Sequence, residues 1–272
     1  MASPAPPAGL VERLRAAGCV FAEEEAVLLA EAAEDGVALE RMAAARAEGV
    51  PLEQVVGWAD FCGLRISVAP TVFVPRRRTG LLVRLALEVL RPGGPPGDLP
   101  ADIVVDLGCG TGAIAAALLA AEPGLDLWAV DLDPTAVTCA RRNLPPERVL
   151  EGDLYTPLPT RLRGRVDLVA ANAPYVPTDA IATMPPEARD HEARIALDGG
   201  RDGLDVQRRV IAEAPGWLAP GGRLLVETSV RQAGGTAAAM RAAGLVAEVR
   251  HDQDLEGTVA VGRSPGVTPE VV

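Results

Sequence analysis

Short apolar runs alternate with helical segments from Asp102 onward, and this rhythm restricts the chain to a small set of folds. Four runs are apolar enough to be strands buried on both faces, at 102–107, 126–131, 166–171 and 222–228. Helical segments lie between them, at 112–121, 134–143 and 203–215. Such alternation predicts a doubly wound, Rossmann-like α/β sheet whose ligands bind at the carboxyl ends of its strands.

The C-terminal part departs from this alternation. A last helix is expected near 232–243, and two short strand candidates follow it, Leu245–Val249 and Thr258–Gly262. They could form an antiparallel edge pair on an otherwise parallel sheet. We expect the tail after Arg263 to be frayed.

The N-terminal part has a different pattern. Residues 8–48 carry apolar side chains at helical spacing, interrupted by glycines, which predicts about three short helices. The stretch from Gln54 to Val74 has the pattern of a β-hairpin, Thr79–Leu90 that of a helix, and 91–100 is rich enough in Pro and Gly to be a loop. We expect three parts: a helical domain at 1–50, a hairpin linker at 51–75 and a doubly wound α/β domain at 76–272.

Bulk properties favour a cytoplasmic protein. The net charge of the 272 residues is −11 with the acids spread along the chain, which weighs against direct nucleic-acid binding. Four isolated cysteines, Cys19, Cys62, Cys109 and Cys139, suggest reduced thiols and no metal site. The N-terminus lacks the features of a signal peptide, and the longest apolar run, 113–121, is too short to span a membrane.

A glycine-rich loop follows the first strand of the alternating region. In Asp106-Leu-Gly-Cys-Gly-Thr-Gly112 the glycines permit a tight turn and a close backbone approach to a ligand. The same residues, through Ala113, also satisfy the dinucleotide fingerprint. Two structural alternatives stay open: the glycines could serve turn geometry alone, and Asp106 could cap a helix.

Polar side chains at three successive strand ends distinguish between the possible cofactors. Asp131 lies where a ribose-binding carboxylate belongs. Asp153 follows a further candidate strand, Arg148–Leu150, and could accept a hydrogen bond from an adenine amino group, although it could also be a plain turn residue. Asn172 follows the next strand. This series favours S-adenosylmethionine over a nicotinamide.

The tetrapeptide Asn172-Ala173-Pro174-Tyr175 offers a carboxamide and nearby backbone carbonyls, with no titratable group before the tyrosine. Such groups cannot act as a general base at neutral pH, but they can accept hydrogen bonds from an NH2. Beside an adenosine cofactor, this suggests methyl transfer to nitrogen.

Together these motifs resemble those of the protein-(glutamine-N5) methyltransferases that modify release factors. The resemblance covers roughly 49–263 and includes Pro51-Leu-Glu-Gln-Val-Val-Gly57, Val72-Phe-Val-Pro75-Arg76, His191-Glu192-Ala-Arg-Ile-Ala-Leu197 and Pro220-Gly-Gly-Arg-Leu-Leu-Val-Glu227. It implies a class I methyltransferase sheet, S-adenosylmethionine as cofactor, and a protein or peptide substrate, a release factor with a Gly-Gly-Gln motif.

The resemblance also implies roles for individual residues. The catalytic loop would be Asn172, Ala173, Pro174 and Tyr175. Substrate contacts would come from Pro75, Arg76, Asn172, Tyr175 and Glu192, with Glu192 locking its loop through Arg194 or Arg76. The cofactor would be held by Asp106, Gly108, Cys109, Gly110, Thr111, Gly112, Asp131, Leu132, Asp153, Leu154 and Asn172.

Two departures from the family's pattern bear on the substrate. Ala173 stands where the family usually has proline, which leaves the backbone carbonyl but loosens the loop. Arg77 and Arg78 replace a proline and an acid, so the substrate could be more acidic, or both arginines could simply face solvent.

Other functions remain possible: methylation of adenine in nucleic acid, methylation of a small metabolite, or a catalytically silent cofactor-binding scaffold. His191 is expected in a polar loop without a catalytic role, and His251 is assigned none.

Overall fold

A computed structural model describes residues 7, 9–90 and 101–265 of the chain. The loop predicted at 91–100 and most of the tail predicted after Arg263 lie outside these residues. None of the helices within the described ranges is long and apolar enough to cross a membrane.

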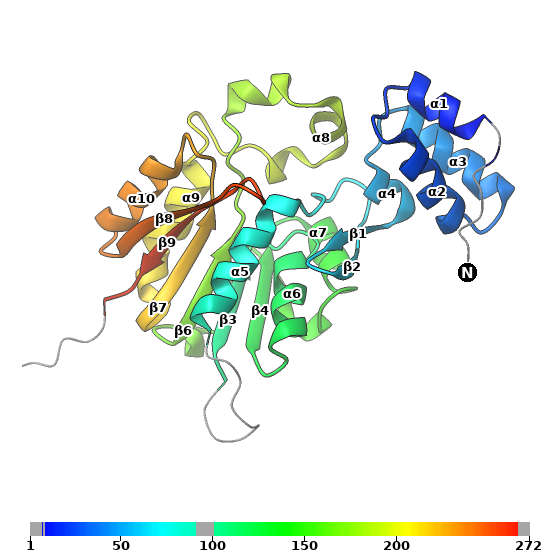
Figure 1. The fold of residues 1–272 in the computed structure, drawn as a ribbon. Coiled ribbons are helices and arrows are strands. Elements are labelled where there is room, and N and C mark those ends of the chain that lie inside the picture. Colours follow the sequence, from blue (N-terminus) through cyan, green and yellow to red (C-terminus); the bar gives the residue numbers. More distant parts are fainter. Residues whose placement is uncertain (1–6, 8, 91–100, 266–272) are drawn as a thin grey trace, which may run out of the picture.

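A seven-stranded sheet forms the centre of the larger part of the molecule (Figure 1), with the order β5-β4-β3-β6-β7-β9-β8. Its first five strands are parallel: β3 (Ile103–Leu107), β4 (Asp126–Asp131), β5 (Val149–Glu151), β6 (Val166–Ala171) and β7 (Leu218–Glu227). At the other edge β9 (Gly257–Arg263) pairs antiparallel with both β7 and β8 (Val246–Asp252). The predicted Rossmann-like sheet and its antiparallel edge pair are confirmed.

Helices cover both faces of the sheet, because successive strand residues point to opposite sides. In β3, Val104 packs into one core and Val105 into the other. The first core also takes residues of α5 (Gly80–Val89), α6 (Ala113–Ala121) and α7 (Pro134–Ala140). The second is closed by α9 (Asp205–Glu213) and α10 (Ala233–Ala242). The helices predicted over these segments are therefore present, with boundaries shifted by a few residues.

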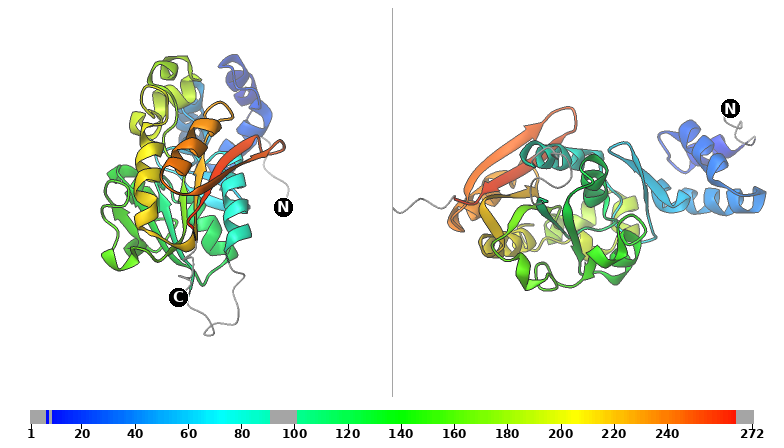
Figure 2. Two further views of the ribbon diagram at one scale, coloured as in Figure 1. Left: turned by 90° about the vertical axis from the view of Figure 1, so that its left-hand side faces the viewer. Right: turned by 90° about the horizontal axis from the view of Figure 1, so that it is seen from below.

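The N-terminal helices form a separate unit beside the sheet (Figure 2). The three predicted short helices are present as α1 (Leu10–Ala16), α2 (Ala22–Ala32) and α3 (Gly36–Ala47). They enclose a small core of their own that includes Leu14, Ala26 and Leu29. Arg46 joins this unit to the rest of the molecule, because its guanidinium binds Glu25 of α2 and also Glu187 of α8 (Pro186–His191).

The hairpin predicted from Gln54 to Val74 is shorter in the structure. Its strands are β1 (Trp58–Phe61) and β2 (Leu64–Ser67), and a short helix, α4 (Leu52–Val56), occupies the beginning of the predicted stretch. Pro51 precedes this helix and Gly57, with φ of 82°, ends it in the left-handed conformation that favours glycine. The prediction of a strand at 54–56 was wrong because these two end signals outweigh the β-branched valines between them.

A segment without strands follows β6 and lies beyond the carboxyl ends of the sheet, next to α4 (Figure 1). It contains a 3-10 turn at Thr178–Thr183 and then α8. His191, expected in a polar loop, is the last residue of α8. The segment is tied to the chain before the sheet by Gln54, whose side-chain amide donates to the carbonyls of Val72 and His191.

Candidate active site

A large cavity of about 980 Å³ opens at the carboxyl ends of the parallel strands. Its walls come from the glycine-rich loop after β3, the ends of β4 and β5, the loop after β6, and α8. This is where a doubly wound sheet is expected to bind its ligand. The cavity brings together nearly all the residues that the sequence suggests, as the lining includes Pro75, Arg76, Gly108, Cys109, Gly110, Thr111, Asp131, Leu132, Asp153, Leu154, Asn172, Ala173, Pro174, Tyr175 and Glu192.

Two candidates of the glycine-rich loop stand outside this lining. Asp106 is fully buried behind the wall, where its Oδ2 accepts a hydrogen bond from the backbone N–H of Ala115, at 3.2 Å, in the first turn of α6. This geometry fits the alternative that Asp106 caps a helix. Gly112 lies at the N-terminus of the same helix, and a Cβ there would come within 2.7 Å of the Leu144 side chain.

The carboxylate of Asp131 braces the glycine-rich loop from the neighbouring strand. Its Oδ2 accepts from the N–H of Gly110 at 2.8 Å, and its Oδ1 accepts from the N–H of Asp133 at 2.9 Å. Burial raises the pKa of Asp131, although both hydrogen bonds oppose the shift. Each carboxylate oxygen retains capacity to accept another bond, as a pair of ribose hydroxyls would require.

Asp153 faces the cavity from the loop after β5 and is not alone there. Its Oδ2 lies 2.6 Å from Nη2 of Arg209, which projects from α9 and also lines the cavity. Arg209 was missed by the sequence analysis, because it lies 56 residues further along the chain and no motif marks it. At this end of the cavity, the pair can offer both an acceptor and a planar cation.

The side chain of Asn172 is oriented by a hydrogen bond to Thr79, which also lines the cavity. Its Nδ2 donates to Oγ1 of the buried Thr79 at 3.3 Å, so that Oδ1 remains for a ligand. Ala173 is buried, and Tyr175 closes one side of the cavity with its hydroxyl 3.3 Å from Oε1 of Glu227. Burial and the carboxylate raise the pKa of Tyr175 to about 12, so its phenol is protonated at neutral pH.

Glu227, at the end of β7, is a functional residue to which the sequence analysis gave no role. It is 1% exposed, and its Oε1 also accepts from Nε of Arg78 at 3.3 Å. Burial raises the pKa of Glu227, while a hydrogen bond from Thr79 and the charge of Arg78 oppose the shift. An acid that ends an apolar strand is the only local signal that could have revealed it.

The two unusual arginines have different environments. Both are exposed, but Arg78 lines the cavity and forms an ion pair with Glu227, whereas Arg77 stands outside the lining. The added positive charge near Tyr175 is therefore partly balanced by a buried carboxylate.

Glu192 locks the loop between β2 and α5 to the segment after α8. Its Oε1 accepts from the backbone N–H of Val74 at 3.0 Å and from the guanidinium of Arg76. Of the two arginines suggested as its partner, the structure selects Arg76, because Arg194 pairs with Asp198. Burial raises the pKa of Glu192 against the lowering effect of Arg76.

Neither histidine belongs to the cavity lining. His251 lies in β8, where Nδ1 is 2.9 Å from Oγ1 of Thr258. His191 contributes its backbone carbonyl to Gln54.

Comparison with known proteins identifies the family. A family model described as the methyltransferase small domain matches residues 84–194. A release factor glutamine methyltransferase of Deinococcus radiodurans is 42% identical over 211 residues, which cover 76% of this chain and 72% of that protein. The chain belongs to the release factor glutamine methyltransferase family. A relative of the same name from Geobacter sulfurreducens is 38% identical over 206 residues, which cover 74% of this chain and 68% of that protein.

A solved structure agrees with this family at the level of the fold. The crystal structure of a methyltransferase from Pyrococcus furiosus superposes with a TM-score of 0.52 over 75% of this chain and 90% of that chain. At 16% identity the likeness concerns the methyltransferase fold alone.

Membership of this family makes S-adenosylmethionine the cofactor, as the sequence predicted. The residues present fit it. Gly108 and Gly110 have positive φ, and a Cβ on either would meet no atom within 4 Å, so their backbone faces open space. Asp131 supplies acceptors beside this open backbone, and a cavity of about 980 Å³ has room for a nucleoside and a second group.

Replacing Asp131 by alanine is expected to weaken S-adenosylmethionine binding about tenfold to a hundredfold, because hydrogen bonds to a charged group are worth about 1.5–3 kcal/mol. Titration calorimetry would measure this change. The matched control is Asp133→Asn, since Asp133 caps α7 through the N–H of Thr135, and asparagine can keep this cap while Asp131 stays in place. Equal affinities of Asp131→Ala and wild type would contradict the assignment.

The buried carboxyl of Asp106 predicts a dependence of stability on pH. Burial and the nearby Asp131 raise its pKa from 3.8 to about 7. As the pH rises between these two values, the unfolded chain gives up this proton before the folded chain does, and the folded state loses stability. Asp106→Asn removes this loss, so its free energy of unfolding relative to wild type should rise from pH about 4 to about 7 and then level off. Denaturant titrations over that range test this, and a constant difference would contradict it.

Proposed function

We propose that this chain transfers the methyl group of S-adenosylmethionine to the side-chain amide nitrogen of a glutamine in a protein. We propose further that this glutamine belongs to the Gly-Gly-Gln motif of a translation release factor. The observation that carries the proposal is the orientation of Asn172: its Nδ2 is held by Thr79, which leaves the carbonyl oxygen for a ligand NH2 in the cavity. The names of the relatives in Deinococcus radiodurans and Geobacter sulfurreducens support the same substrate.

The amide of glutamine would bind between two uncharged acceptors. Asn172 Oδ1 accepts one N–H of the substrate and the backbone carbonyl of Ala173 accepts the other. Because both hydrogens are engaged, the nitrogen presents its lone pair to a fixed direction. The same oxygens stabilise the positive charge that develops on the nitrogen, which favours the transition state over the ground state.

The proposed reaction depends more on aligning the glutamine nitrogen with the methyl carbon than on transferring a proton within the site. When bound, the cofactor supplies a methyl carbon already activated by a sulfonium. A carbon–nitrogen bond forms at the glutamine as the carbon–sulfur bond breaks, and the amide then gives one proton to water. Tyr175 is protonated at neutral pH and serves as a wall of the site. Pro75 and Arg76, with Glu192 behind Arg76, would border the entrance of the peptide.

Residues 1–50 would serve to dock the protein substrate, ahead of the linker at 51–75 and the catalytic part at 76–272. The N-terminal unit carries exposed apolar side chains, Val20, Phe21 and Val37, which suit a contact with another protein. Arg46 fixes this unit beside α8, whose Glu187 lines the cavity.

The test is to incubate the enzyme and cofactor with unmodified release factor and to locate the added methyl by tandem mass spectrometry. We expect one methyl on the glutamine of Gly-Gly-Gln and none on a release factor in which that glutamine is glutamate. A Gly-Gly-Gln peptide and duplex DNA are assayed in parallel. Methylation of DNA alone would favour the adenine alternative, and cofactor binding without any transfer would favour a silent scaffold.

A further inference from the structure

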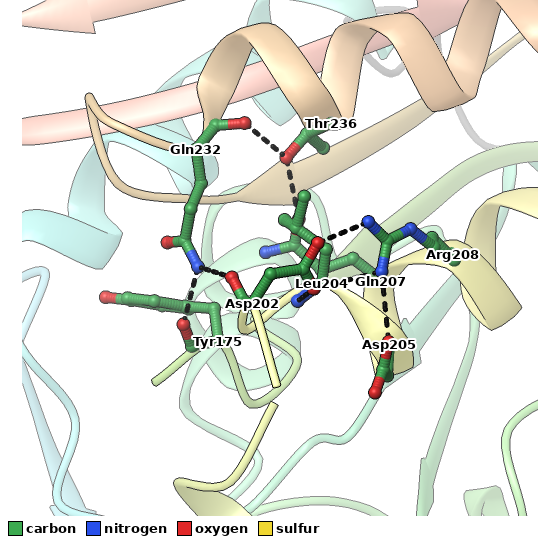
Figure 3. A network of polar contacts seen from close by, with 8 residues as sticks. All are labelled: Tyr175, Asp202, Leu204, Asp205, Gln207, Arg208, Gln232 and Thr236. Carbon is green, nitrogen blue, oxygen red and sulfur yellow. Dashed lines mark hydrogen bonds and ion pairs between the residues drawn. The ribbon is translucent and has the colours of Figure 1, made fainter. Parts of the chain in front are cut away.

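The loop that carries Asn172 is held from the side that faces away from the cavity. Gln232, just before α10, donates from Nε2 to the backbone carbonyl of Tyr175 at 2.8 Å (Figure 3). The same Nε2 donates to the backbone carbonyl of Asp202 at 3.0 Å. One side-chain amide therefore ties the loop after β6 to the turn that precedes α9.

Gln232 is itself fixed by its surroundings, so it can hold the loop in one position. Its Oε1 accepts from the hydroxyl of Ser229, and its backbone carbonyl lies 3.3 Å from Oγ1 of Thr236. Thr236 is buried and also donates to Oε1 of Gln207 at 2.7 Å, which joins α10 to α9 (Figure 3).

Two glycines allow the turn before α9 to pack directly against the backbone of the loop that carries Asn172. A Cβ at Gly199 would lie 2.7 Å from the carbonyl oxygen of Pro174 and 2.8 Å from Cα of Tyr175. A Cβ at Gly203 would lie 2.3 Å from the carbonyl oxygen of Tyr175. The backbone of this turn therefore stands against Pro174 and Tyr175, and Gln232 closes the contact.

Pro174 transmits this restraint to the two groups that would accept hydrogen bonds from the substrate amide, the side chain of Asn172 and the carbonyl of Ala173. Its ring fixes φ near −65°, so few torsions separate the carbonyl of Tyr175 from that of Ala173. A shift of the Tyr175 carbonyl therefore moves the Ala173 carbonyl and the Asn172 side chain with it. Displacements on the order of 1 Å at a reacting centre can cost a hundredfold in rate.

We propose that Gln232 is a positioning residue for methyl transfer, acting through the carbonyl of Tyr175 on the two acceptors of the amide. This inference rests on the proposed function for its effect on the reaction. Gln232 lies outside the cavity lining, so it acts without touching the substrate.

The test compares Gln232→Met, which keeps the length but removes the donor, with Gln232→Glu, which turns an acceptor toward two carbonyl oxygens. On release factor we expect kcat to fall about tenfold in the first, because both hydrogen bonds that hold the loop are lost, and further in the second. KM and the Kd of S-adenosylmethionine should stay within about twofold, because neither ligand touches Gln232. The matched control is Met240→Ala, which lowers Tm because it removes a buried core side chain of the same helix, α10, but leaves the hydrogen bonds of Gln232 in place and should keep kcat near that of wild type.

A second measurement is independent of any substrate. Hydrogen exchange of the backbone N–H of Val176 and Gly199, which bond to the carbonyls of Leu197 and Val176, reports the opening of the loop. We expect this exchange to be at least about tenfold faster in Gln232→Met than in Met240→Ala. Unchanged exchange, or a kcat that falls in both variants only in step with Tm, would overturn the inference. If exchange is faster in Gln232→Met but the wild-type enzyme does not methylate release factor, the restraint of the loop by Gln232 is supported and the proposed substrate is rejected.

Discussion

Replacing Asn172 by alanine is expected to lower kcat by about a hundredfold or more, because the substrate amide loses the acceptor that orients it and stabilises its developing charge. The Kd of S-adenosylmethionine should change little, since we propose that the glycine-rich loop and Asp131 are its main contacts. Steady-state kinetics with release factor, together with calorimetric titration of the cofactor, measure the two effects separately.

Thr79→Val provides a graded comparison for this result. It removes the partner of Nδ2 but leaves Asn172 in place, so the carboxamide can rotate away from its productive orientation. We expect a loss of roughly tenfold in kcat, the size of one neutral hydrogen bond. The exposed Arg77→Ala serves as a neighbouring control without effect on turnover. An Asn172→Ala enzyme with full turnover would contradict the role of the carboxamide.

Replacing Arg46 by methionine is expected to destabilise the contact between the N-terminal helices and the rest of the molecule by about 3–5 kcal/mol. Arg46 is buried and bonds both carboxylate oxygens of Glu25, with Nε–Oε2 at 2.6 Å and Nη2–Oε1 at 3.1 Å. Its Nη1 bonds Glu187 at 2.6 Å. Without the guanidinium, the buried charge of Glu25 is left unpaired, which is the main cost. Denaturant unfolding followed by circular dichroism measures the change.

The same helical unit offers a matched control. Arg13 forms an exposed ion pair with Glu40, and pairs of this kind contribute about 0–1 kcal/mol. Arg13→Met should therefore unfold almost as wild type does. A second variant, Arg46→Met with Glu25→Met, should recover much of the lost stability, because no unpaired charge remains. If Arg46→Met and Arg13→Met unfold alike, Arg46 does not join the two parts.

Local pattern was sufficient to predict the sheet and the side chains at its strand ends. Runs such as 166–171 are buried on both faces, so their apolar character is continuous and specifies a central strand. The polar residue after each run then has to face the carboxyl edge, which is why Asp131, Asp153 and Asn172 all line one cavity. The antiparallel edge pair was visible for a similar reason, as two short strand patterns follow the last helix.

The supports of these residues could not be predicted, because each is a single polar side chain whose partner is distant in sequence. Thr79, Glu227 and Gln232 reach the loop at Asn172–Tyr175 from three other elements. The number of residues between each of them and this loop depends on how the whole chain packs, so no motif spacing in the sequence indicates these contacts. α4 was missed for the opposite reason: local end signals at Pro51 and Gly57 decide its state against the β propensity of its valines.

A crystal structure with S-adenosylhomocysteine and a Gly-Gly-Gln peptide tests the central claim most directly. We expect the glutamine nitrogen within about 3.2 Å of both Asn172 Oδ1 and the carbonyl oxygen of Ala173, with the cofactor sulfur on the open side of that nitrogen. A glutamine side chain bound elsewhere in the cavity, or a carboxamide at Asn172 turned with its NH2 toward the substrate, would contradict it.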